Sequence, residues 1–130
     1  MIVVDTSVWI DYFNGNRTPE TDRLDALLGR DPLGIGDLIL TEILQGFRSD
    51  SDFREAKDFL LSLTLFEMLG VDQALRCAEY YRELRKRGIT VRKTADVIIA
   101  TFCIVENHAL LYTDRDFDPF VKHFGMRAVV

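Results

Sequence analysis

Apolar residues recur along the chain with two different spacings, which predict strands alternating with helices. Runs typical of buried strands lie at 2–4, 63–69, 109–112 and 126–130, with a further short apolar segment at 33–35. Elsewhere the apolar residues recur every three or four positions, and this predicts helices over 8–13, 21–28, 38–44, 52–61, 72–87, 94–105 and 119–124. The alternation favours an α/β fold with a mainly parallel central sheet flanked by helices.

Polar residues at the expected helix starts, and glycines after helix ends, support these boundaries. We expect four helices to be capped by Thr6 or Ser7, by Asp37, by Asp72 and by Thr94. The helix from Thr94 is apolar on nearly every side, so it is expected to be central and buried.

Length and composition indicate one ordinary globular domain spanning 1–130. Of the 130 residues, 48% are hydrophobic and 28% are charged, close to the averages of globular domains. No apolar run is long enough to cross a bilayer, and the first residues carry no signal-like pattern. We therefore expect no membrane contact and a cytoplasmic location. Cys77 and Cys103 fall in helical patterns outside any metal-binding motif, which favours reduced core thiols.

The net charge of −5 argues against a non-specific nucleic-acid binder, but the basic residues are concentrated in one place. Six of them, against the single acid Glu83, lie in the stretch 82–93. Such a run is either a solvated helix face or a surface that meets a polyanion. Composition alone leaves both interpretations open.

Three acids follow predicted strands, where parallel α/β sheets bind their ligands. Asp5 ends the first strand, and Asp114 and Asp116 follow the strand at 109–112. Aspartate is also common at strand ends as a turn or cap residue, so each position alone is weak evidence. Two strand ends with the same chemistry make a shared site the stronger hypothesis.

Two more acids lie on helices among apolar neighbours. Asp96 falls in the first turn of the apolar helix, where it also complements the helix dipole by about 0.3–1 kcal/mol. Glu42 lies within the apolar stretch 38–44, where an unpaired buried carboxylate would be costly. Several carboxylates without matching basic residues suggest an oxygen-rich site for Mg²⁺ or Mn²⁺. The chain has only two histidines, His108 and His123, both near predicted helix ends, so we expect cap or surface residues and no zinc site.

Sites in which clustered carboxylates bind divalent ions commonly catalyse phosphoryl transfer. A metal lowers the pKa of a bound water and offsets charge on the phosphate, so no protein nucleophile is needed.

Four motifs in order resemble the PIN-domain ribonucleases, and specifically the VapC toxins of prokaryotic toxin–antitoxin modules. The motifs are IVVDTSVW at 2–9, TEILQG at 41–46, TADVIIA at 94–100 and LYTDRDF at 111–117. The resemblance covers essentially the whole chain, and the chain departs from the family pattern at none of the acids.

The resemblance implies a single PIN-like domain with a four-acid Mg²⁺ site, with Mn²⁺ as the alternative ion. Asp5 and Asp96 would be the most direct ligands, Glu42 and Asp114 would complete the site, and Asp116 is an accessory or alternative acid. Thr6 or Ser7 would help to hold a ligand or water.

The activity implied is an endoribonuclease toxin that cuts RNA, with tRNA or rRNA loops as expected substrates, by metal-activated water. A cognate VapB-type antitoxin would lie over the active-site groove, and a homodimer is the common state of the family.

The basic segment gains a use beside such a site, because acids alone would repel RNA. We expect contacts to RNA from a set of polar and basic residues: Thr6, Ser7, Arg85, Arg92 and Lys93. Phosphate contacts position RNA without reading its sequence, so the substrate cannot be identified from them.

Other functions fit less well. The triplet at 5–7 occurs in aspartic proteases, which need two such carboxylates in an all-β frame. A dehalogenase-like phosphatase usually has a second acid at the position of Ser7, and the glycines at 34 and 36 lack the third glycine of a dinucleotide loop. The main alternative is a catalytically silent module that binds RNA or antitoxin. Aromatic residues at helical spacing are either core or the lining of an antitoxin groove or dimer interface: Trp9, Tyr12, Phe13, Phe47, Phe53 and Phe59.

Overall fold

The structure, a computed structural model, describes residues 1–129 and confirms the α/β class. Its elements in chain order are β1 Ile2–Val4, α1 Thr6–Phe13, α2 Pro19–Leu27, β2 Leu33–Gly36, α3 Asp37–Leu44, α4 Asp50–Leu60, β3 Thr64–Phe66, α5 Val71–Lys86, α6 Thr94–Val105, β4 Ala109–Leu111, the 3₁₀ helix η1 Arg115–Phe117, α7 Asp118–Phe124 and β5 Arg127–Ala128. None of the helices described here is long and apolar enough to cross a membrane.

The five strands form one sheet in the order β3-β2-β1-β4-β5, with every recorded pairing parallel. From β1 the chain builds outward through β2 to β3, and then returns to the other side of β1 to form β4 and β5. The strand order therefore reverses between β1 and β4, which is the place where open α/β sheets bind ligands.

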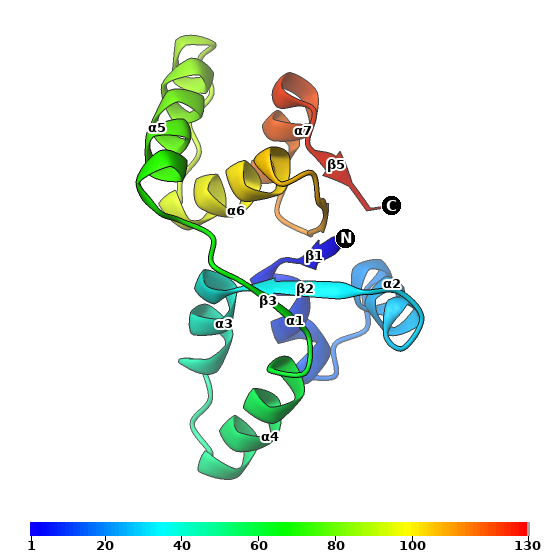
Figure 1. Cartoon of the computed structure of the whole chain (residues 1–130). Helices are drawn as coiled ribbons and strands as arrows, with labels where there is room; N and C mark the ends of the chain where they lie inside the picture. Colours follow the sequence, from blue (N-terminus) through cyan, green and yellow to red (C-terminus); the bar gives the residue numbers. More distant parts are fainter. Residues whose placement is uncertain (130) are drawn as a thin grey trace.

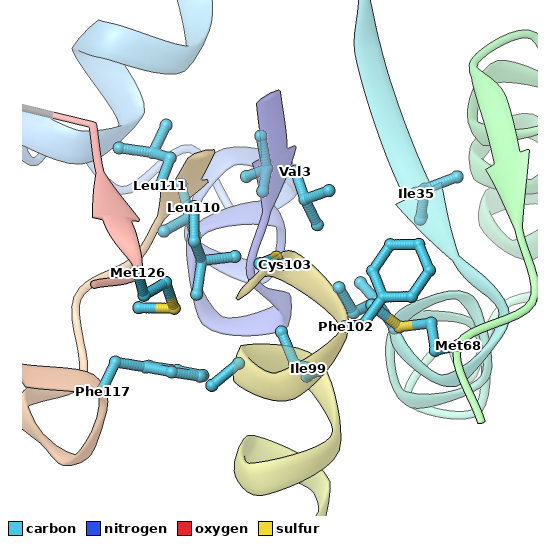
Figure 2. Packing of buried hydrophobic residues seen from close by; sticks show 14 of the residues in the cluster. Val3, Ile35, Met68, Ile99, Phe102, Cys103, Leu110, Leu111, Phe117 and Met126 are labelled. Atoms are coloured by element: carbon cyan, nitrogen blue, oxygen red, sulfur yellow. The ribbon is translucent and has the colours of Figure 1, made fainter. Parts of the chain in front are cut away.

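Helices cover both faces of the sheet. In Figure 1, α5, α6 and α7 lie above the sheet and α1, α3 and α4 below it. The apolar helix α6 is buried as predicted, with Val97, Ile99, Phe102 and Cys103 in the core. Figure 2 shows α6 side chains in one cluster with those of the strands. Because α6 is held on the sheet along its length, its first turn has a fixed position at the sheet edge.

The predicted helices are present, but their starts differ from the expected caps. The residues at the N-cap positions of α1, α3, α5 and α6 are Asp5, Gly36, Gly70 and Lys93, and none makes a side-chain cap bond. The predicted caps lie inside these helices, so that part of the prediction was wrong. At α1 the Ser7 hydroxyl donates to the carboxylate of Asp5, the residue at the N-cap position, instead of accepting a bond from a helix amide.

Two elements begin before the predicted positions because of local capping. Thr18 and Thr21 form a reciprocal capping box, so α2 begins at Pro19. Ser49 caps α4 through the Asp52 amide.

Three strands are shorter than predicted, and the one expected at 109–112 ends at Leu111. The strand expected at 63–69 is paired only over Thr64–Phe66, and the last one only over Arg127–Ala128. Val130, included in the predicted last strand, lies outside the described residues.

Candidate active site

Two acids mark the point where the strand order reverses. Asp5 directly follows β1, and its amide donates to the Leu111 carbonyl of β4 at 2.9 Å. Asp114 lies just beyond β4, before η1. The predicted proximity of the two strand ends is therefore present in the structure.

Two helices add an acid each to the same place. Glu42 comes from α3 and Asp96 from the first turn of α6. A pocket of about 260 Å³ is lined by residues of these four segments, namely Asp5, Thr6, Ser7, Ile10, Glu42, Gln45, Lys93, Asp96 and Asp114. The four acids predicted for the site thus share one pocket.

Hydroxyl groups of α1 orient two of the carboxylates. Thr6 donates to Glu42 Oε1 at 2.7 Å, and Ser7 donates to Asp5 Oδ2 at 3.0 Å. Glu42 is half-buried rather than fully buried, and Thr6 is its hydrogen-bond donor. Glu42 is therefore less buried than its apolar neighbours suggested, and it has the hydrogen-bond donor that a carboxylate in this stretch needs.

Burial and like charges disfavour ionisation in this pocket. Burial raises the pKa of Asp5, against the opposing hydrogen bond from Ser7. The pKa of Asp96 is raised to about 7, chiefly by burial and then by the nearby charges of Asp5 and Asp114, while Lys93 acts in the opposite direction. A position in the first turn of a helix would favour the ionised form. The raised pKa therefore shows that the stabilising effect of the helix dipole is not the main influence on the Asp96 carboxylate.

The donor set fits a hard divalent cation. One carboxylate oxygen from each of Asp96, Asp114 and Asp116 lies within 4.8 Å of the other two. Asp96 is only 7% exposed, and its buried Oδ2 has no hydrogen-bond partner. Carboxylate oxygens are the ligands preferred by Mg²⁺ and Mn²⁺. A cation beside Asp96 would compensate both the unpartnered oxygen and the repulsion among the acids.

Asp114 and Asp116 differ in their contacts. Asp114 lines the pocket, and its Oδ1 accepts the Asp116 amide at 2.9 Å, which fixes the turn into η1. Asp116 is bound by Arg92, whose Nε lies 3.0 Å from Asp116 Oδ2. Asp116 does not line the pocket with the other four acids.

The predicted RNA-contact residues are only partly brought together. Thr6, Ser7 and Lys93 line the pocket, and Arg92 lies at its edge through Asp116. Arg85 points elsewhere on α5, with its guanidinium carbon 5.6 Å from the centre of the Tyr81 ring.

Gln45 was not singled out from the sequence, although it lines the pocket. The available signal was its position three residues after Glu42, which places the C-cap residue of α3 on the same side of the helix as Glu42. Its amide adds a hydrogen-bond donor to the acidic lining.

A second cavity of about 500 Å³, here called the aromatic cavity, has four aromatic side chains among its eight lining residues. Its aromatic residues are Tyr12 and Phe13 of α1, Phe47 between α3 and α4, and Phe59 of α4. A small hollow of about 120 Å³ shares Ile10 with the acidic pocket, and Phe13 and Phe47 with the aromatic one. The small hollow therefore lies between the acidic pocket and the aromatic cavity and shares lining residues with both.

The aromatic residues divide between core and groove. Trp9 is fully buried and stacks on Phe13 with ring centres 5.9 Å apart. Phe59 is 37% exposed, and its ring packs edge-on against Trp9. The core interpretation is thus confirmed for Trp9, while the role of the accessible rings as an antitoxin groove or dimer interface stays a prediction.

Known proteins with similar sequences belong to one family of ribonucleases. Residues 2–121 match the PIN domain family. The VapC ribonuclease Mb1587 of Mycobacterium bovis is 29% identical, and the alignment covers 98% of this chain and 97% of that protein. Ribonuclease VapC1 of Methanocaldococcus jannaschii is 30% identical, with 97% of this chain and 85% of that protein covered.

Solved structures share the fold at lower identity. VapBC2 from Rickettsia felis, crystallised with a DNA fragment from its promoter, gives a TM-score of 0.77 at 19% identity, covering 99% of this chain and 98% of that one. FitAcB from Neisseria gonorrhoeae also gives 0.77, at 15% identity and with 100% and 97% of the two chains covered.

Proposed function

The chain belongs to the PIN domain family, and on that premise we propose that it is a metal-dependent endoribonuclease acting as the toxin of a toxin–antitoxin pair. The observation that carries the proposal is the pocket at the reversal of strand order, which is lined by Asp5, Glu42, Asp96 and Asp114. The names of the curated relatives, which are VapC ribonucleases, support the reaction class. A catalytically silent binding module would have no need of four acids in one pocket.

In this proposal Asp5 and Asp96 hold a divalent ion, with Glu42 and Asp114 completing its surroundings. When bound, Mg²⁺ or Mn²⁺ would lower the pKa of a water molecule and would offset the negative charge of the phosphate. The chain's own groups prepare the site, because Ser7 orients Asp5 and Thr6 holds the Glu42 carboxylate toward the pocket. Lys93, at the pocket wall, reduces the repulsion that an RNA phosphate would meet there.

The proposed substrate is RNA, with single-stranded loops of tRNA or rRNA as the first candidates. Loops suit an open pocket because their phosphates and bases are accessible from several sides. Thr6, Ser7, Arg92 and Lys93 are the proposed contacts near the cut, and Arg85 would contact a more distant phosphate. A cytoplasmic location belongs to the same proposal, and the two free cysteines fit a reducing compartment.

Purified protein, free of antitoxin, is expected to cut total cellular RNA into discrete fragments with Mg²⁺ or Mn²⁺ and to leave it intact with chelator. Asp5→Asn should abolish the fragments, because it removes a carboxylate from the pocket while keeping its shape. Asp31→Asn, an exposed acid in the loop before β2, is the matched control and should cut normally. Gel electrophoresis with circular dichroism of each variant measures cleavage and folding together. Folded wild-type protein that cuts no RNA with either ion would favour the silent module instead.

We further propose that the aromatic cavity receives a segment of a VapB-type antitoxin. Solved structures with this fold include VapBC complexes, which supports a protein partner. The cavity combines aromatic rings with two acids, Asp52 and Glu55, on its lining. This chemistry suits a peptide with apolar side chains flanked by basic ones, whereas acids at the rim would repel RNA.

Reversing one rim charge should weaken that complex. Glu55→Lys is expected to lower antitoxin affinity about 10-fold, within the range of interface residues that matter for binding. Glu79→Lys makes the same change on α5 and should leave the affinity unaltered. Isothermal calorimetry with the antitoxin encoded beside this chain measures both. Equal affinities for the two variants would place the antitoxin on another surface.

A homodimer is also proposed. Apolar side chains at the start of α5 are exposed, with Val71 at 78% and Leu75 at 61%. Asp72 lies at one end of this face and Arg82 lies further along it. If two copies packed their α5 helices around a two-fold axis, Asp72 of each copy would approach Arg82 of the other. Sedimentation measures the oligomeric state directly.

A further inference from the structure

One ion pair links two separate segments at the rim of the acidic pocket. Arg92, in the loop before α6, contacts Asp116 of η1 with Nε and Oδ2 3.0 Å apart. The other ion pairs recorded among residues 1–129 lie along α5 and its following residue Arg87. The Arg92–Asp116 pair is therefore a tertiary contact between the segments that carry Asp96 and Asp114.

The two members of the pair differ in exposure. The Asp116 side chain is 22% exposed, while that of Arg92 is 72% exposed. The carboxylate is thus the fixed partner, held in the turn whose amide binds Asp114. The guanidinium is the accessible partner, and it uses only Nε for Asp116. Its two terminal nitrogens remain available as donors for an acceptor in solution.

The position of this guanidinium is defined by the acids. One oxygen of Asp116 lies within 4.8 Å of oxygens of Asp96 and Asp114. The carboxylate that binds Arg92 is therefore next to two of the acids proposed to surround the ion. An RNA phosphate that approaches the ion would meet these nitrogens on the same side of the pocket. Guanidinium donors match phosphate oxygens in geometry and charge.

We propose that Asp116 is a positioning residue that holds Arg92 for an RNA phosphate beside the cleavage site. Although one Asp116 oxygen lies within 4.8 Å of oxygens of Asp96 and Asp114, the carboxylate is bound by Arg92 and does not line the pocket, so in this proposal the ion is held without it. This inference rests on the proposed ribonuclease function. It separates the two acids of the turn by role: Asp114 faces the pocket with Asp5, Glu42 and Asp96, whereas Asp116 faces Arg92. Holding Arg92 before RNA arrives reduces the entropy lost when the phosphate is bound.

Loss of the Asp116 charge has opposite expected effects on RNA binding, depending on whether Asp116 positions Arg92. Removing the negative charge of Asp116 reduces repulsion, so charge alone would strengthen RNA binding. If Asp116 positions Arg92, its removal releases the guanidinium and weakens RNA binding instead. A ligand role makes a third prediction, since loss of a metal-binding carboxylate lowers metal affinity.

The experiment compares Asp116→Asn, Arg92→Gln and the double variant with wild-type protein. Steady-state cleavage of a fluorescent single-stranded RNA gives KM and kcat, and calorimetry with Mn²⁺ alone gives metal affinity. We expect each single variant to raise KM about 10-fold, with kcat and Mn²⁺ affinity within about 3-fold of wild type. The double variant should match the single variants, because the two residues act as one unit. Arg115→Gln, an exposed arginine on the same turn, is the control and should leave KM unchanged.

Three results would overturn the inference. They are a lower KM for Asp116→Asn, a Mn²⁺ affinity lowered more than about 10-fold by Asp116→Asn, or KM increases that multiply in the double variant. If wild-type protein cuts no RNA, the proposed function fails. Fluorescence anisotropy of the same RNA with Mn²⁺ then tests the pair through binding alone.

Discussion

Replacing Asp96 by Asn is expected to lower RNA cleavage at least about 100-fold, because the site would lose one of the two carboxylates proposed to hold the ion, a larger effect than loss of an outer-shell partner. The same change is expected to make the metal-free protein more stable. In the folded chain the pKa of Asp96 is raised to about 7 by burial and by Asp5 and Asp114, so its ionisation at higher pH opposes folding. Asn has nearly the same shape and no charge, which removes this penalty.

The gain in stability at pH 8 should be about 1–2 kcal/mol, less than the full shift in pKa would imply because the pocket is open to solvent. Urea denaturation with chelator present measures it, alongside cleavage assays with Mg²⁺. Asp72→Asn, at an exposed acid in the first turn of α5, should change neither quantity by a comparable amount. A less stable Asp96→Asn protein would mean that the carboxylate has a structural partner in the folded chain.

Opposite effects on activity and stability distinguish a functional acid from a structural one. An acid that only capped α6 would stabilise the helix, so its removal would lower stability. The burial of Asp96 beside other acids, with an unpartnered oxygen, is unfavourable until a cation is bound.

The fold was largely predictable because its elements carry strong local signals. The apolar residues of α6 predict a buried helix, and the alternation of strands and helices predicts a parallel sheet. Helix starts were less predictable because several residues can cap a helix, and the choice depends on contacts made elsewhere. Ser7, expected as a cap, instead donates to Asp5.

The acids of the site were predictable, but their individual contacts were not. Asp5 and Asp114 are marked by their positions after strands, and parallel strand ends lie on one edge of a sheet. The bond from Thr6 to Glu42 joins residues 36 apart in the sequence, and the pair of Arg92 and Asp116 joins residues 24 apart. No local pattern encodes such pairs, because they depend on how α3 and η1 meet the rest of the fold.

In wild-type protein without divalent ions, stability is expected to fall as pH rises from about 4 to about 7. The unfolded chain loses the Asp96 proton near the ordinary pKa of 3.8, whereas the folded chain keeps it until about 7. The folded state therefore binds more protons across this interval, and stability decreases with increasing pH. The raised pKa of Asp5 contributes in the same direction.

Divalent ions should reverse this fall, because they bind the ionised carboxylates of the folded chain. Mn²⁺ at about 100 times its dissociation constant should add about 2.7 kcal/mol of stability at pH 8. At pH 4 the effect should be much smaller, because protonated Asp96 is a poor ligand. Thermal or urea denaturation across this pH range measures stability against pH with chelator and with Mn²⁺. In Asp96→Asn the difference between these two curves should depend less on pH. Parallel curves with and without Mn²⁺ would show that the ion does not bind at these acids, and the pocket would then need a different occupant to explain its charge.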